Sequence, residues 1–81
     1  SLQIYPNPAK EFLNIDIGTD LASKQGIELL LFNTVGQLQS AQPISNIGVS
    51  TIAIEALQQG LYLFQLKTKE EILMNGKVLV E

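Results

Sequence analysis

The sequence contains no cysteine, histidine, tryptophan or arginine among its 81 residues. Without histidine and cysteine it has no Ser-His-Asp or Cys-His nucleophile system. The usual ligands of structural zinc, haem and iron–sulfur centres are also missing. No disulfide can cross-link the fold, so cysteine usage does not indicate a redox compartment. These absences argue against an enzyme and predict a chain that binds no cofactor.

Positive charge is also scarce, because five lysines face eight acidic residues and give a net charge of −3. A nucleic-acid-binding domain requires a basic face that displaces counterions from the phosphates. The longest apolar run, residues 29–32, is far shorter than the ~20 residues that span a bilayer. We therefore expect neither nucleic-acid binding nor membrane insertion.

The length allows one domain with one core, and such a short chain buries only roughly 60–65% of its unfolded surface. Apolar residues make up 46% of the sequence and charged residues 16%, which is typical of a folded domain and not of a disordered tail. Neither a signal peptide nor an initiator methionine opens the chain. We therefore expect residues 1–81 to be one domain of a longer protein.

Apolar and polar residues alternate with a period of two, which predicts half-buried strands. With the turn signals between them, the patterns predict strands at residues 2–5, 11–17, 27–32, 37–41, 49–54, 61–68 and 72–80, and a loop at residues 42–48. No helical pattern exceeds about one turn. The sequence therefore predicts an all-β fold, an immunoglobulin-like β-sandwich of about seven antiparallel strands.

The last predicted strand has two interpretations. Asn75-Gly76 is the strongest two-residue signal for a β-hairpin turn. The apolar side chains nevertheless keep one parity through this dipeptide: Ile72, Met74, Val78 and Val80. We favour a single edge strand with a bulge at Asn75-Gly76 over a hairpin.

Two groups of carboxylates are candidates for chemistry. Asp16 and Asp20 follow a strand and offer oxygen ligands for a weak Ca²⁺ site, but two carboxylates are few for calcium. A solvated strand end with an Asx turn is the simpler interpretation. Glu70 and Glu71 are adjacent, so in a strand they point to opposite faces and cannot act as an acid–base pair. We interpret them as a charged turn.

Tyr62 follows Gly60 by two residues at the start of a strongly alternating strand. The alternation places the Tyr62 side chain inward, which favours a tyrosine corner, whose hydroxyl bonds to upstream backbone, over an exposed recognition aromatic. Gly60 then supplies a backbone angle that a side chain would obstruct. The lysines form no patch.

Four sequence motifs occur in a fixed order. The chain opens with Tyr-Pro-Asn-Pro-Ala at residues 5–9, and an Asn-x-x-Gly turn follows at residues 33–36. A Gly-x-Tyr element follows at residues 60–62, and Lys-Val-Leu-Val stands at residues 77–80. In this order and at these spacings, the motifs resemble the C-terminal sorting domain of type IX secretion, and the resemblance covers essentially the whole chain.

The resemblance implies an immunoglobulin-like sandwich that is the C-terminal sorting domain, residues 1–81, of a longer secreted protein. Such a domain is a non-catalytic signal that directs its cargo through the periplasm to the outer-membrane surface or the medium. The implied partners are the type IX translocon, its shuttle proteins, a sortase-like protease that removes the domain, and the upstream cargo domain.

The resemblance also assigns roles to residues. The motif positions that we expect to be structural are Pro6, Asn7, Pro8, Gly36, Gly60 and Tyr62. The terminal positions that we expect the machinery to recognise are Lys77, Val78, Leu79 and Val80. We expect a partner to add a strand to the edge that these terminal residues form. The alternative function is an adhesion or carbohydrate-binding accessory module of a secreted enzyme, which would need exposed aromatic residues.

Overall fold

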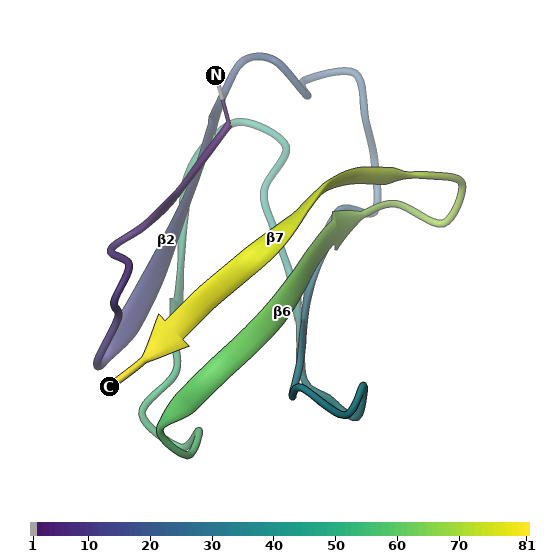
Figure 1. The fold of residues 1–81 in the computed structure, drawn as a ribbon. Helices are drawn as coiled ribbons and strands as arrows, with labels where there is room; N and C mark the ends of the chain where they lie inside the picture. Colours follow the sequence, from purple (N-terminus) through teal and green to yellow (C-terminus); the bar gives the residue numbers. More distant parts are fainter. Residues whose placement is uncertain (1) are drawn as a thin grey trace.

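The fold is built from short strands alone. The computed structural model describes residues 2–81 and contains, in chain order, β1 (Gln3–Tyr5), β2 (Phe12–Gly18), β3 (Glu28–Phe32), β4 (Leu38–Pro43), β5 (Gly48–Ala53), β6 (Gly60–Lys67) and β7 (Ile72–Val80). They form two sheets, with the strand orders β1-β2-β5 and β4-β3-β6-β7. All pairings between these strands are antiparallel. The predicted seven-stranded, all-β sandwich is confirmed, and Figure 1 shows β6 and β7 side by side with β2 in the other sheet.

The core lies between the two sheets and is made by alternate side chains of their inner faces. From the three-stranded sheet, Leu13 and Ile15 are essentially inaccessible to solvent, and Leu29 and Leu31 face them from the four-stranded sheet. The other buried apolar side chains are Ala9, Ile17, Leu21, Ile27, Ile44, Ile52, Ile54, Tyr62, Phe64, Leu66, Val78 and Val80. The period of two in the sequence therefore identified the core faces of β2 and β6 correctly.

The predicted loop at residues 42–48 is too long by three residues, because β4 ends at Pro43 and β5 begins at Gly48. β4 continues through Pro43, because Gln42 pairs with Leu29 and Pro43 pairs with Glu28. Proline is compatible with this position because β4 lies at the edge of its sheet, where an amide can face solvent. Beyond the strand, the Ile44 amide donates to the Ile27 carbonyl, and the Ile44 side chain closes that end of the core.

The last strand differs from the prediction in one respect. β7 is a single strand, as expected, but the bulge is not at Asn75-Gly76, which pair in register with Gln65 and Phe64. The register shifts nearer the start of the strand, between Met74 and Ile72. Ile72 is therefore exposed, contrary to the parity expected from the sequence.

The Phe64 ring explains why Gly76 lies within the strand. A Cβ atom added at Gly76 would lie only 2.9 Å from two atoms of that ring. Phe64 is buried, so the ring has little room to move. The glycine at this position thus provides space for an aromatic side chain on the neighbouring strand and does not form a turn.

We predict that Gly76→Ala destabilises the chain by about 1–3 kcal/mol, because the new methyl group overpacks the site beside Phe64. Urea denaturation measures the change, and Asn75→Ala, at the exposed neighbouring position, is the matched control. The loss in Gly76→Ala should be smaller when Phe64 is also changed to Leu. Equal losses in both backgrounds would show that the ring is not the cause.

Candidate recognition surface

The register of β7 divides the four predicted recognition residues into two pairs. Val78 pairs with Tyr62, and both side chains point into the core together with that of Val80. Lys77 and Leu79 point to the opposite side of the sheet and are exposed. The two valines are therefore structural, and only the lysine and the leucine offer their side chains to a partner.

The edge of β7 is occupied where the sequence predicted strand addition. The Asn7 side chain spans this edge, because its Nδ2 donates to the Lys77 carbonyl at 3.2 Å and its Oδ1 accepts from the Leu79 amide at 3.0 Å. The Ala9 amide then donates to the Leu79 carbonyl at 2.8 Å, and the Glu81 amide donates to the Ala9 carbonyl at 2.7 Å. We call these contacts of Asn7 and Ala9 with residues 77–81 the clamp.

The composition of the opening motif suits the clamp. Pro6 and Pro8 have no backbone N–H, so this stretch cannot form a regular ladder with β7. The Asn7 side chain carries one carbonyl and one NH₂ group, the same pairing groups as a peptide unit, and it takes the place of a backbone partner. Ala9 resumes pairing as a parallel bridge to Val80 and is fully buried. The Tyr5-Pro6 and Asn7-Pro8 peptide bonds are both cis.

The clamp changes the expected mode of recognition. Between the Lys77 carbonyl and the Glu81 amide, every edge-facing backbone group of β7 already has a partner within the chain, either Asn7 or Ala9. An added strand would have to displace both residues before it could pair here. Figure 1 shows the end of β7 beside the loop that follows β1, where the clamp lies.

The outer face of the four-stranded sheet, the face turned away from the core, carries an apolar patch. Cross-strand pairs place Leu38, Phe32, Leu63 and Lys77 in one row across β4, β3, β6 and β7. Leu61 pairs with Leu79 in the adjacent row. We call these six residues the outer patch.

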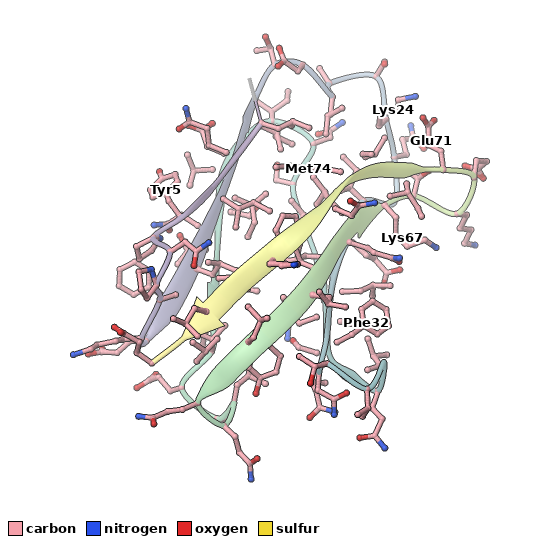
Figure 2. The ribbon with its side chains drawn as sticks, viewed as in Figure 1. Tyr5, Lys24, Phe32, Lys67, Glu71 and Met74 are labelled. Atoms are coloured by element: carbon pink, nitrogen blue, oxygen red, sulfur yellow. The ribbon has the colours of Figure 1, made fainter. Side chains whose placement is uncertain are left out.

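The leucines of the outer patch are well exposed. The exposed fractions are 54% for Leu38, 41% for Leu61, 37% for Leu63 and 40% for Leu79. A shallow depression of about 450 Å³ lies against the patch, between Phe32, Leu63 and Lys77. In Figure 2 Phe32 lies beside β6, on the side away from β7. The sequence analysis did not single out these β6 leucines, although apolar residues at every position from 61 to 64 were the signal for a strand with two apolar faces.

The comparison with protein families now decides the identity of the chain. A family model described as the secretion system C-terminal sorting domain matches residues 3–81. The chain belongs to this family. The family supports a role as a C-terminal signal for type IX secretion, which exports proteins to the cell surface or the extracellular space. A search of curated proteins found no match.

Most motif residues of this sorting domain have a structural explanation. The Tyr62 hydroxyl donates to the Gln58 carbonyl at 2.6 Å, and the side chain is only 5% exposed. The predicted tyrosine corner is thus present, and Tyr62 is not an exposed recognition aromatic. Gly60 (φ 149°) and Gly36 (φ 88°) adopt backbone angles that are strained for other residues.

Asn33 organises the Asn-x-x-Gly turn through its side chain and not through a positive φ. Among residues 2–81 only glycines have positive φ, so the tolerance of Asn for that region does not explain its presence. The Asn33 Oδ1 accepts from the amides of Val35 and Gln37, and Nδ2 donates to Gln37 Oε1 at 2.8 Å. Gly36 closes the turn by donating to the Asn33 carbonyl at 3.0 Å.

The two acidic candidates have structural roles in the sorting domain. Asp16 Oδ1 accepts from the Gly18 amide at 3.0 Å, which is an Asx turn. Glu71 forms an ion pair with Lys24 at 2.8 Å, visible in Figure 2, and so ties the β6–β7 turn to the β2–β3 connection. Residues 2–81 contain no group of three or more side chains of the metal-binding type, and no helix there is long and apolar enough to cross a membrane.

We predict that Asn7→Ala opens the clamp and destabilises the sorting domain by about 0.5–1.5 kcal/mol, since two hydrogen bonds to β7 are lost. Amide hydrogen exchange should accelerate at Leu79, whose N–H faces Asn7, more than at Val78, whose N–H faces β6. Asn75→Ala on the same strand is the control. A uniform change at both amides would indicate general destabilisation and contradict a local clamp.

We also predict that Tyr62→Phe lowers the free energy of unfolding by about 1 kcal/mol, because the Gln58 carbonyl loses its hydroxyl donor. Tyr5→Phe removes the hydroxyl of a tyrosine that is 40% exposed, and it should change the stability by less. Thermal unfolding by circular dichroism compares the two variants. Equal effects would mean that the corner hydrogen bond contributes nothing specific.

Proposed function

We propose that residues 1–81 are the C-terminal sorting domain of a longer secreted protein and act as its non-catalytic export signal. The cargo passes through the periplasm, the type IX translocon and its shuttle proteins recognise the domain, and a sortase-like protease removes it. The match of the sorting-domain family to residues 3–81 is the observation that carries this proposal.

The construction of the fold supports a role as a signal. The sandwich contains no cysteine, so its stability does not depend on a disulfide or on the redox state of the compartment that it crosses. The hydroxyl of Tyr62 is engaged with backbone, and the carboxylate of Glu71 is engaged with Lys24. A chain without histidine and cysteine also lacks the common general bases and nucleophiles.

Within the terminal segment, we assign recognition to Lys77 and Leu79 and a supporting role to Val78 and Val80. The exposure of the first pair and the burial of the second pair support this division. The alternative of a carbohydrate-binding module gains no support from Tyr62 and Phe64, because buried rings offer no platform to a sugar; the exposed aromatic side chains are Tyr5 and Phe12.

The test is the export of a reporter. Residues 1–81 are fused to the C-terminus of a fluorescent protein that carries a periplasmic signal peptide, in a host with type IX secretion. We expect the reporter at the cell surface or in the medium, and processed to a smaller size than the fusion. The same fusion in a translocon-deficient strain, and the reporter without residues 1–81, are the controls. Retention of the folded fusion in the periplasm of the competent host would refute the proposal.

A deletion of residues 78–81 is unsuitable for this test. It removes the buried Val78 and Val80 side chains and the Glu81 amide that bonds to Ala9. Loss of several core contacts unfolds a small domain, so a failure of export would report on folding and not on recognition.

A further inference from the structure

We propose that the sorting domain docks through the outer patch of its four-stranded sheet and not through the edge of β7. The partner is an apolar surface of the secretion machinery that presents a carboxylate to Lys77. This inference rests on the proposed function, and it adds the face, the mode of binding and the chemistry of the partner.

The first argument is accessibility. Recognition of the terminal segment by strand addition needs free backbone groups, and between Lys77 and Glu81 the clamp occupies those that face the edge. Recognition by side chains leaves only Lys77 and Leu79, since the valines between and after them are buried. Lys77 and Leu79 both lie on the outer face of the four-stranded sheet. A partner that binds the side chains of the terminal segment must therefore contact that face.

The second argument is the contrast between the two outer faces of the sandwich. On the three-stranded sheet the outer face is mixed. Thr51 Oγ1 donates to Asn14 Oδ1 at 2.7 Å, and this polar row separates the exposed Phe12 from the exposed Val49, which pairs with Asp16. A solvated sheet face has this composition. The outer patch instead presents four leucines and Phe32, in one row that crosses all four strands and a second row that joins β6 and β7. Contiguous exposed apolar surface of this kind marks an interaction site.

The third argument is charge. Lys77 is the only charged member of the outer patch, and it stands at the β7 end of the row that contains Leu63. The next charged pair on this face, Glu28 and Lys67, is separated from the patch by the row that contains Gln65. A chain with a net charge of −3 thus presents an isolated cation beside its exposed leucines. Complementarity requires an apolar partner surface with a carboxylate at that point.

The depression beside Lys77 indicates how the partner fits. Phe32 and Leu63 give it an apolar wall, and the amides of Gln65 and Asn75 lie at its polar side. The depression of about 450 Å³ accommodates an apolar side chain, while the neighbouring carboxylate reaches Lys77.

The test uses the reporter fusion in the competent host. Leu63→Gln and Lys77→Glu should each lower the surface-exposed reporter by about tenfold, because they change the centre of the proposed interface. Val49→Gln is the apolar control on the other sheet, and Lys67→Glu is the charge control on the same face; each should change export by less than about twofold. Melting temperatures within about 4 °C of the parent show that the variants fold.

Strand addition at the edge of β7 and docking through the outer patch predict different effects of Asn7→Ala, which opens the clamp. Docking by strand addition requires Asn7 to leave β7, so Asn7→Ala would increase export in that mode. In docking by the outer patch the same variant gives no increase, because the clamp only holds β7 in place.

The outcomes separate this inference from the proposed function. Retention of the unmodified fusion refutes the function itself. Export of the unmodified fusion together with normal export of Leu63→Gln and Lys77→Glu overturns the docking face and leaves the function intact. A third outcome also overturns the inference. If sedimentation finds that the parent chain is a dimer and Leu63→Gln is a monomer, and both are exported normally, a second copy of the chain covers the patch.

Discussion

The hydrogen bonds between the opening motif and the final strand are the constraint on which the rest of the domain depends. Asn7 and Ala9 join residues about seventy positions away in the chain and fix β7 against the sheet edge. The register with β6 sets which side chains of β7 enter the core, and the clamp holds the opposite edge of the strand. The Pro-Asn-Pro sequence therefore has a structural role, because Asn7 holds the terminal segment that we propose is recognised.

The four-stranded sheet is apolar on both faces, and we propose that the inner face stabilises the fold while the outer face docks to a partner. The inner face of β6 presents Tyr62 and Phe64 to the core, where burial stabilises the sandwich. The outer face presents Leu61 and Leu63, whose exposure costs some solubility and is useful only if another surface covers them. In a domain of 81 residues, a single strand thus contributes both to the core and to the proposed docking face.

The local part of this structure could be read from the sequence and the long-range part could not. Alternation predicted the strands, and the spacing of Gly60 and Tyr62 predicted the tyrosine corner, because both depend on neighbours within a few residues. The clamp joins the two ends of the chain, and the space at Gly76 depends on a ring of another strand. Neither leaves a periodic signal. The hydrogen bonds of the Asn33 side chain are local but were not predicted, because side-chain hydrogen bonding and tolerance of positive φ select the same residue type.

The position of the clamp also has a consequence for synthesis. A ribosome releases Asn7 and Ala9 long before Lys77 and Glu81, so the early segment has no partner until the final strand emerges. A translation product truncated before that strand leaves the sandwich open and its leucines without an ordered neighbour. The clamp can therefore form only after β7 has been synthesised, and a product truncated before β7 also lacks the buried Val78 and Val80 side chains.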